Sequence, residues 1–287
     1  MKALIIGGTG TLGKAVLKKL YKPGNEISII SRDEIKQKDL LRQYPLVKNH
    51  IADIKDSDSM RHYILGNEVV FHFAASKHID FCEENPEESI KANINATMNV
   101  ADLCEGVVPY LVFSSTDKAV LPINTYGMCK AISEKYLFWF NSRQEFTRAS
   151  VFRWGNVLGS RGSVIHSFVK TLKESKEVFI TDQAMTRFWI DIDDAAEFIL
   201  NNYESAELDR PMIPEMRSSS VLKLAELTAH YLGIKDYKIN FTGIRAGEKL
   251  HECILSNHDV CVRSDNTPKY DDQALLEMIR KTLCQAP

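Results

Sequence analysis

The sequence of 287 residues lacks the features that direct a chain to a membrane or to nucleic acid. No apolar run approaches the roughly 20 residues needed to span a bilayer, and residues 1–6 are too short for a signal-peptide core. The formal net charge is −2 with both signs interspersed, so no patch of one sign attracts nucleic acid or an anionic membrane. We therefore expect a cytoplasmic protein.

Cysteine is present, but not in a pattern that binds metal or builds a disulfide framework. The six cysteines are scattered, and no two of them form a C-x-x-C pair. This pattern predicts reduced thiols and no metal site. With 44% hydrophobic and 26% charged residues, the chain has ordinary globular composition and enough length for one core plus a smaller lobe.

A glycine-rich turn directly follows the first apolar run, residues 2–6. Gly7, Gly10 and Gly13 fit the spacing G-x-x-G-x-x-G, and a helical pattern follows. Such glycines allow a tight turn and a close approach of the backbone to a pyrophosphate at the helix N-terminus. A plain strand-to-helix turn is the alternative, but the position straight after a strand favours dinucleotide binding. The cofactor contacts expected between the glycines are Thr9, Thr11 and Leu12.

The end of the second apolar run, residues 26–30, indicates which dinucleotide is bound. Arg32 follows Ser31 there, and Lys36 comes one helical turn later. An arginine at this position favours the 2′-phosphate of NADP, whereas a carboxylate such as Asp33 suits the ribose diol of NAD. NADP is therefore the preferred cofactor and NAD the alternative. A solvated surface charge is the alternative interpretation of Arg32.

The third strand is expected at residues 45–50, and a polar–apolar pair follows it. Asp53 and Ile54 could meet the edge and the face of an adenine ring. Asp53 is also a candidate cap for a helix that starts near Asp56.

Small residues follow the fourth apolar run, residues 68–73. Ala74 and Ala75 at this strand end would let a ligand come close to the backbone. Lys77 follows them and is a candidate for contact with a phosphate or a sugar. An exposed loop lysine is the alternative.

Strand and helix patterns alternate along residues 2–152, with one long helix expected over residues 86–104. This alternation predicts an α/β fold with a doubly wound parallel sheet of Rossmann type and right-handed crossovers. The pattern loosens after a sixth strand at residues 147–152. We expect a dinucleotide-binding core in residues 1–152, with later segments returning to it, and a smaller α/β substrate-binding lobe in residues 153–287.

The candidate chemistry lies at the end of the fifth apolar run, residues 107–113. Five polar residues follow that run: Ser114, Ser115, Thr116, Asp117 and Lys118. If the run is a buried parallel strand, they emerge at its carboxyl end, where open α/β sheets bind ligands. We assign Ser114 and Ser115 to the cofactor.

The pattern Tyr-x-x-x-Lys occurs three times, starting at Tyr44, Tyr126 and Tyr231. Only Tyr126 and Lys130 follow a strand that ends in serines, and their spacing places them on one helical face. A phenol has a pKa near 10, and a nearby ammonium and a nicotinamide ring would both favour the phenolate. We predict that this pair is catalytic and that Lys130 also holds the nicotinamide ribose.

Asp117 and Lys118 indicate a reaction with more steps than hydride transfer alone. Hydride exchange with a carbinol needs a Tyr, a Lys and a polarising hydroxyl, which Thr116 supplies. An added carboxyl and amine suggest a further proton abstraction and a leaving group. A surface ion pair worth under about 1 kcal/mol is the alternative.

Arginines in the C-terminal part are candidates for anionic ligands, because a guanidinium fork matches phosphate oxygens. The four candidates are Arg153, Arg161, Arg187 and Arg245. Each could equally form a surface salt bridge, and the sequence does not show whether they face one cleft.

Together these motifs resemble the extended short-chain dehydrogenase/reductase family. Within it, they are most similar to the soluble, C5-inverting UDP-N-acetylglucosamine 4,6-dehydratases of nonulosonic-acid biosynthesis, over residues 5–255. Besides the glycine turn and Tyr126-x-x-x-Lys130, the matching segments are Ser31-Arg32-Asp33-Glu34, Ala74-Ala75 with Lys77-His78, Ser115-Thr116-Asp117-Lys118-Ala119, Gly155-Asn156-Val157, Gly159-Ser160-Arg161-Gly162-Ser163-Val164, Met185-Thr186-Arg187-Phe188-Trp189 and Gly247-Glu248-Lys249-Leu250-His251-Glu252.

The resemblance implies a mechanism. Tyr126, aided by Lys130, takes the proton of the C4 hydroxyl while hydride passes to NADP. Lys118 then abstracts the C5 proton, and Asp117 protonates the departing C6 hydroxyl. Hydride returns to C6, and reprotonation of C5 from the opposite face inverts it.

The resemblance also implies the ligands. The substrate is UDP-N-acetylglucosamine or a similar nucleotide sugar, and a homo-oligomer of at least two chains is expected. The residues assigned to the substrate are Lys77, Thr116, Asn156, Arg161, Val164, Arg187, Arg245 and Glu248. A nucleotide-sugar 4-epimerase or 4-reductase is the nearest alternative, since it needs Tyr126 and Lys130 alone. A non-catalytic dinucleotide sensor would be expected to lose one of that pair.

Overall fold

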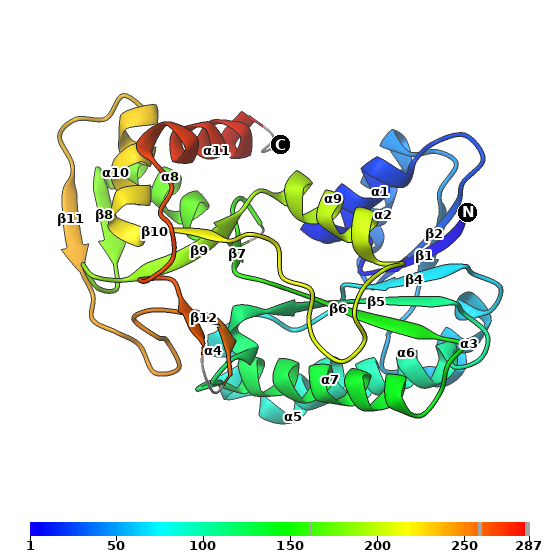
Figure 1. Ribbon diagram of the computed structural model, residues 1–287. Helices are drawn as coiled ribbons and strands as arrows, with labels where there is room; N and C mark the ends of the chain where they lie inside the picture. Colours follow the sequence, from blue (N-terminus) through cyan, green and yellow to red (C-terminus); the bar gives the residue numbers. More distant parts are fainter. Residues whose placement is uncertain (161, 258–259, 285–287) are drawn as a thin grey trace. The chain divides into compact units, whose positions relative to one another are not determined.

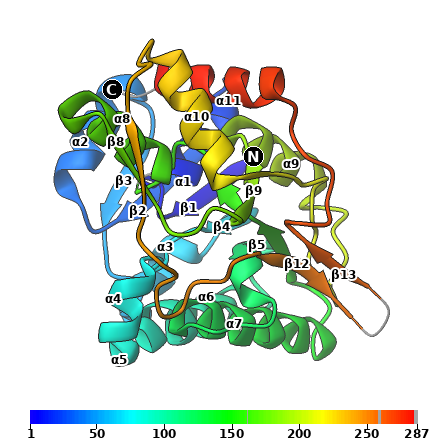
Figure 2. The same ribbon diagram turned by 90° about the vertical axis from the view of Figure 1, so that its left-hand side faces the viewer.

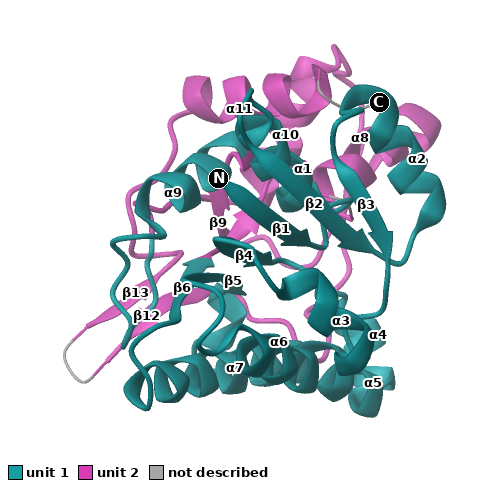
Figure 3. Cartoon of the chain, turned by 90° about the vertical axis from the view of Figure 1, so that its right-hand side faces the viewer, with its two compact units in different colours: residues 1–153, 193–213 teal, residues 154–192, 214–287 magenta. Residues whose placement is uncertain are grey.

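The computed structural model describes residues 1–160, 162–257 and 260–284 (Figure 1). The chain divides into two compact units (Figure 3). The first unit comprises residues 1–153 and 193–213, and the second comprises residues 154–192 and 214–287. Each unit has its own cluster of buried apolar side chains.

The first unit is built on a six-stranded sheet in the order β3-β2-β1-β4-β5-β6. The pairs β1–β2, β1–β4, β2–β3 and β4–β5 are parallel. This strand order is the Rossmann order, so the predicted doubly wound α/β sheet is confirmed. The strands are β1 (Lys2–Ile6), β2 (Glu26–Ser31), β3 (Lys48–Ile51), β4 (Val69–His72), β5 (Tyr110–Thr116) and β6 (Arg148–Trp154).

Helices cover both faces of this sheet: α1, α2 and α9 lie on one face, and α3, α6 and α7 on the other (Figure 1). On the second face, Leu4, Val70 and Phe113 of the strands pack with Met60 of α3 and Leu137 of α7. The helices are α1 (Thr11–Leu20), α2 (Glu34–Gln43), α3 (Ser57–Ile64), α4 (Ile79–Glu84), α5 (Pro86–Ile90), α6 (Ala96–Cys104), α7 (Thr125–Ser142) and α9 (Ile192–Asn202).

The helix predicted over residues 86–104 is not one uniform α-helix. Between α5 and α6 the backbone forms a π-helical turn, η1 (Lys91–Asn95). The hydroxyls of Thr97 and Ser133 both donate to the Asn93 carbonyl, at 2.6 and 3.0 Å. Side chains that bond a backbone carbonyl in this way relax the regular ladder, and such bulges are frequent at functional sites.

The second unit has three small sheets: β10-β9-β7, β11-β8 and the hairpin β12-β13. Its core joins Phe168 of α8, Trp189 of β9, Leu224 of α10 and Ile279 of α11. The strands are β7 (Asn156–Val157), β8 (Glu177–Ile180), β9 (Thr186–Ile190), β10 (Arg217–Ser220), β11 (Lys238–Phe241), β12 (Cys253–Ser256) and β13 (Cys261–Arg263). The helices are α8 (Val164–Ser175), α10 (Val221–Tyr231) and α11 (Asp272–Cys284).

One capping prediction is wrong. Asp56, not Asp53, caps α3, with its carboxylate accepting from the Ser59 amide at 3.2 Å. Asp53 instead accepts from the Lys55 amide at 3.0 Å and stays outside the helix.

Across the ranges that the structure describes, no helix combines the length and apolarity needed to cross a membrane.

Candidate active site

The glycine turn after β1 is built for close backbone approach. Gly7 has φ +85°, and a Cβ there would lie 2.8 Å from the Ala74 nitrogen at the end of β4. A Cβ at Gly13 would lie 2.5 Å from the Gly7 carbonyl, so α1 packs directly against the turn. Gly10 precedes α1 as its N-cap, and the Gly10 amide donates to the Gly7 carbonyl at 2.9 Å. Only glycines fit this cradle, which matches what a pyrophosphate at a helix N-terminus requires.

The segments on either side of the glycines have few side chains in the way. Thr9 is buried in the turn, while Thr11 and Leu12 are half-buried in the first turn of α1. At the neighbouring strand end, Ala74 is half-buried and Ala75 is exposed. Small side chains at the ends of β1 and β4 suit the close approach of a ligand to the backbone at this edge of the sheet.

At the end of β2, the two candidate cofactor contacts Asp33 and Arg32 lie in different surroundings. Asp33 caps α2 by accepting from the Lys36 amide at 3.0 Å, and the Lys36 ammonium pairs with the same carboxylate. Arg32 is 72% exposed, and its nearest acid is Asp53, 3.9 Å away. A carboxylate engaged in a cap and an ion pair is less available to a ribose diol, whereas Arg32 extends into solvent. Ile54 is half-buried beside Asp53.

Asn93 fixes the loop after β4. Its side-chain oxygen accepts from the Ser76 amide, and its side-chain nitrogen donates to the Ser76 carbonyl, both at 2.9 Å. Lys77, the next residue, is exposed. The sequence placed Asn93 only on a helix, and the clamp on Ser76 depends on a contact 17 residues away that no local pattern signals.

The polar residues after β5 are more buried than expected, because the strand continues through Thr116. Asp117 is fully buried, and its Oδ1 accepts from the Thr116 hydroxyl and from the Lys118 ammonium, both at 3.0 Å. The alternative of a solvent-exposed ion pair at Asp117 and Lys118 is therefore excluded. Carboxyl and ammonium lie on one short 3-10 turn, η2 (Asp117–Ala119), and the Thr116 hydroxyl belongs to the residue that caps this turn.

Helix α7 packs directly against that turn. A Cβ at Gly127 would lie 2.2 Å from the Lys118 carbonyl, so only glycine allows this approach. The Asn124 side chain starts the helix by accepting from the Gly127 amide at 2.7 Å. The consequence is that Tyr126, beside Gly127, reaches the side chains of η2.

Tyr126 interacts with three of the predicted catalytic groups. Desolvation raises the pKa of Tyr126 to about 12, while the Lys118 charge and a hydrogen bond with Thr116 act in the opposite direction. Asp117 raises it further. The cation that favours the phenolate is therefore Lys118, whereas the Tyr-x-x-x-Lys pattern indicates Lys130.

Lys130 is buried on the same helix. Its ammonium donates to the Ser114 carbonyl at 2.8 Å and lies 4.1 Å from the centroid of the Phe113 ring. Burial lowers the pKa of Lys130 to about 7, and the nearby Glu134 charge opposes this shift. An amine that changes charge near neutral pH suits proton exchange in an active site.

Arg153, which lies in strand β6, is not available to an anionic ligand. It forms a buried ion pair with Glu134, with N–O distances of 3.0 and 2.5 Å. Glu134 lies one helical turn after Lys130, so this buried pair joins strand β6 to helix α7. The two residues are 19 positions apart, so the sequence alone did not reveal the pairing.

One buried hydroxyl at the end of β5 lacks a partner. The Ser115 Oγ is shielded from solvent and has no hydrogen-bond partner within the described part of the chain. Buried polar atoms are nearly always satisfied, so an orphaned hydroxyl beside the ligand-binding edge is consistent with a contact to a bound group. Together with the glycine cradle, it fits a dinucleotide cofactor.

The second unit carries the other predicted substrate contacts. Arg187 is buried, and one of its terminal nitrogens donates to the Thr186 and Leu250 carbonyls at 2.8 and 3.1 Å. Arg245 is exposed, and Glu248, three residues later, has one carboxylate oxygen that is buried without a partner among the described residues. Asn156 of β7 and Val164 at the start of α8 are half-buried, and Arg161 lies outside the described residues.

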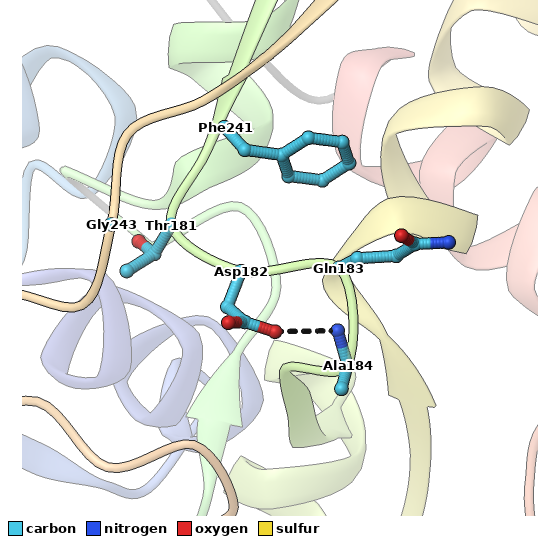
Figure 4. A pocket seen from close by; sticks show the side chains of 6 residues that line it. All are labelled: Thr181, Asp182, Gln183, Ala184, Phe241 and Gly243. Carbon is cyan, nitrogen blue, oxygen red and sulfur yellow. Dashed lines mark hydrogen bonds between the residues drawn. The ribbon is translucent and has the colours of Figure 1, made fainter.

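A pocket of about 730 Å³ lies at the ends of β8 and β11 (Figure 4). The Phe241 ring, 52% exposed, borders it together with the hydroxyl of Thr181 and the amide of Gln183. Asp182 closes the turn by accepting from the Ala184 amide at 2.8 Å. An aromatic face beside amide and hydroxyl groups suits a heterocyclic base. The sequence interpretation did not single out these residues. No group of three or more potential metal ligands occurs among the described residues.

The sequence matches a protein-family model described as "Polysaccharide biosynthesis protein" over residues 3–273. It is 42% identical to a UDP-N-acetylglucosamine 4,6-dehydratase (inverting) of Campylobacter jejuni over 265 residues, which cover 89% of this chain and 78% of the relative. It is also 37% identical to a UDP-glucose 4-epimerase of Rickettsia akari over 273 residues, covering 91% and 80%.

The fold has a close counterpart among solved structures. The X-ray structure of Pen from Bacillus thuringiensis superimposes with a TM-score of 0.92 at 29% identity, covering 98% of this chain and 97% of that one. The similarity therefore extends over both units of the chain, not over the six-stranded sheet alone.

Proposed function

Because the chain belongs to the polysaccharide biosynthesis protein family, with nucleotide-sugar dehydratases and epimerases as relatives, we propose that it is a UDP-N-acetylglucosamine 4,6-dehydratase. The reaction is NADP-dependent and inverts C5. Its product is a UDP-4-keto-6-deoxy-N-acetylhexosamine for bacterial-type glycan synthesis of the nonulosonic-acid kind.

The observation that carries this proposal is the buried contact between Asp117 and Lys118 beside Tyr126. Elimination of water from C5 and C6 needs a base for the C5 proton and an acid for the C6 hydroxyl. Lys118 and Asp117 supply both groups, joined by a 3.0 Å hydrogen bond. Epimerisation at C4 needs neither of them.

Asp117 and Lys118 can also exchange a proton with each other, which gives both residues the protonation states that the elimination needs. Transfer of one proton along the hydrogen bond converts the ammonium and carboxylate into an amine and a carboxylic acid, which are the reactive forms of the base and the acid. The full burial of Asp117 favours this exchange, because burial penalises the charged pair. After Lys118 takes the C5 proton and Asp117 donates to the leaving hydroxyl, the charged pair is restored.

The remaining residues prepare the sugar for this step. Tyr126 takes the proton of the C4 hydroxyl, and the Lys118 charge and the Thr116 hydrogen bond favour its phenolate. The resulting 4-ketone acidifies the C5 proton, so that an amine can remove it. Thr116 also orients the sugar. NADP, when bound, accepts the C4 hydride and returns it to C6.

The cofactor is assigned to the first unit. Gly7, Gly10 and Gly13 would hold the pyrophosphate, and Lys130 the nicotinamide ribose. Arg32, exposed at the end of β2, together with Lys36 would hold the 2′-phosphate of NADP. NAD remains the alternative cofactor. Further contacts fall to Thr9, Thr11, Leu12, Ser31, Asp33, Asp53, Ile54, Ala74, Ala75, Lys77, Ser114 and Ser115.

The nucleotide part of the substrate is assigned to the second unit. The exposed Arg245 and the unpartnered oxygen of Glu248 supply charge and hydrogen-bond capacity. The pocket beside Phe241 would hold the base by stacking. The other proposed substrate contacts are Asn156, Arg161, Val164 and Arg187. Lys77, a residue of the first unit, is also assigned to the nucleotide sugar.

We also propose a cytoplasmic homo-oligomer of at least two chains. Helix α7 exposes Met128, Ile132 and Trp139, each about half exposed and spaced to share one face. A cluster of large apolar side chains on one helical face is typical of a protein–protein contact.

A second candidate is a nucleotide-sugar 4-epimerase, which the 37% identity to the Rickettsia akari protein favours. Incubation of the protein with NADP and UDP-N-acetylglucosamine, followed by chromatography and mass spectrometry, separates the two. A product that has lost one water supports the dehydratase. A product of unchanged mass that co-elutes with the C4 epimer supports the epimerase and refutes the dehydratase.

A further inference from the structure

Two cysteine thiols of the second unit are in contact. Cys253 of β12 and Cys261 of β13 have their Sγ atoms 3.4 Å apart. Both cysteines carry free thiols. They lie on the antiparallel hairpin β12–β13, seen most clearly in Figure 2. None of the roles proposed for the substrate or the cofactor involves either thiol.

The strand register explains how the thiols meet. Ser256 pairs with Cys261, and the register shifts between Cys253 and Leu255, so that Cys253 pairs with Arg263. Cys261 is two residues from Arg263 and is therefore the diagonal neighbour of Cys253 across the ladder. Diagonal neighbours on one face of an antiparallel pair are close enough for side-chain contact, and the bulge brings these two together.

The two thiols differ in access. Cys261 is exposed, whereas Cys253 is 4% exposed and also contacts the Leu255 carbonyl at 3.2 Å. Burial and the hydrogen bond with Cys261 raise the pKa of Cys253 to about 11. An oxidant from solvent therefore meets Cys261 first, and Cys253 waits as the second thiol.

We propose that Cys253 and Cys261 form a dithiol–disulfide site that reacts with low-molecular-weight disulfides such as glutathione disulfide. The Cys261 thiolate attacks one sulfur of the reagent, forming a mixed disulfide and releasing one thiol. The Cys253 thiol then loses its proton and attacks the Cys261 sulfur, releasing the second thiol. The protein dithiol is oxidised to a disulfide, and the reagent is reduced to two thiols.

The disulfide would tether the hairpin where it joins the segment that carries Glu248. Just before Cys253, the Glu252 amide donates to the Ser264 hydroxyl at 3.0 Å. The Ser264 hydroxyl also contacts Thr186, and Thr186 contacts His251. A covalent link between β12 and β13 would therefore restrain the strands next to Glu252 and Ser264. These two residues belong to the hydrogen-bond network with Thr186 and His251 that holds the segment before β12.

The other four cysteines offer controls. Cys82, Cys104 and Cys129 are buried, while Cys284 is exposed on α11 with its sulfur 3.8 Å from the Tyr231 hydroxyl. Cys284 shares the accessibility of Cys261 but has no thiol partner within the described residues. It should take up glutathione and keep it.

The test treats the folded full-length protein with glutathione disulfide, alkylates the remaining thiols and maps the peptides by mass spectrometry. The expected result is a Cys253–Cys261 cross-link in the wild-type protein, with no glutathione retained on Cys261. The Cys253→Ser variant should retain glutathione on Cys261 at least about tenfold more than the wild type, because the resolving thiol is missing. The Cys284→Ser variant should form the cross-link as the wild type does.

Two outcomes would overturn the proposal. One is equal retention of glutathione on Cys261 in the wild type and in Cys253→Ser. The other is a wild-type protein in which Cys253 stays fully alkylated after Cys284 has been modified. The second outcome is read on the wild-type chain alone, so the proposal can be overturned even if Cys253→Ser folds poorly.

Discussion

The Lys118 ammonium donates a hydrogen bond to Asp117 Oδ1 over 3.0 Å, at a carboxylate that is fully buried. The two side chains come from adjacent residues, and the 3-10 turn after β5 is what lets them meet. The Thr116 hydroxyl donates to the same oxygen. A carboxylate, an ammonium and a hydroxyl are thereby held within one turn of backbone, next to the Tyr126 phenol.

Lys118→Ala should abolish dehydration while NADP still binds. In the proposed mechanism the amine removes the C5 proton, so we expect a loss of about 10²–10⁴-fold in turnover, the usual range for one general base. NADP titration followed by fluorescence should give an unchanged dissociation constant. Lys135→Ala, an exposed lysine on the same α7 helix as Tyr126, is the control and should be fully active. Full turnover by Lys118→Ala would remove this lysine from the mechanism.

Gly7→Ala should destabilise the protein more than Gly24→Ala. Both glycines have positive φ, +85° and +88°, so both variants bear the backbone strain of about 1–2 kcal/mol. Only at Gly7 does the new methyl group meet backbone, 2.8 Å from the Ala74 nitrogen, while nothing lies within 4 Å at Gly24. Urea unfolding should show an extra loss of about 1–3 kcal/mol for Gly7→Ala, together with weakened NADP binding. Equal losses of unfolding free energy in the two variants would show that the turn at Gly7 accommodates a methyl group without a steric clash.

Arg32→Ala should change cofactor preference. The exposed guanidinium at the end of β2 is assigned to the 2′-phosphate, so we expect NADP to bind about tenfold more weakly and NAD to bind unchanged, a loss of about 1.4 kcal/mol. Arg42→Ala is the matched control, because Arg42 is an exposed arginine of α2 paired with Asp39. Isothermal titration with both cofactors decides the matter. An equal change for NADP and NAD would contradict the assignment.

Glu134→Gln should destabilise the protein strongly. It leaves the buried Arg153 guanidinium without its charge partner, and breaking a buried pair costs about 3–5 kcal/mol. It also removes the charge that raises the pKa of Lys130, so that pKa should fall further below about 7. Glu277→Gln, which breaks an exposed pair with Arg280 on α11, should leave the denaturation midpoint unchanged. Similar midpoints for both variants would show that the buried pair contributes little.

The central sheet could be predicted from sequence because its signals are local. Apolar runs such as residues 2–6 and 26–30 fall on β1 and β2, and the glycine turn between them leaves few backbone choices. The short strands of the second unit carry no such signal. The strand β10, with the sequence Arg-Ser-Ser-Ser, is nearly all polar and is held by pairing with β9. Its last residue, Ser220, caps helix α10 by accepting from the Lys223 amide.

The candidate site likewise has features that the local sequence predicts and features that depend on contacts between distant segments. The grouping of Thr116, Asp117 and Lys118 follows from their adjacency, and Tyr126 from its place at the start of the next helix. The partners of Lys130 could not be foreseen, since the Ser114 carbonyl and the Phe113 ring reach it only through packing of α7 on β5. The Asn93 clamp on Ser76 and the pairing of Glu134 with Arg153 likewise join distant parts of the chain.

The most direct test of the proposed reaction is an NMR time course of the wild-type protein with NADP and UDP-N-acetylglucosamine in D2O. We expect a UDP-4-keto-6-deoxy sugar that carries deuterium at C5 in the inverted configuration, because in the proposed mechanism Lys118 removes the C5 proton and solvent returns a deuteron from the opposite face. Deuterium at C5 with the original configuration would refute inversion. The appearance of the C4 epimer alone, with C6 still hydroxylated and no deuterium at C5, would contradict the dehydratase assignment itself.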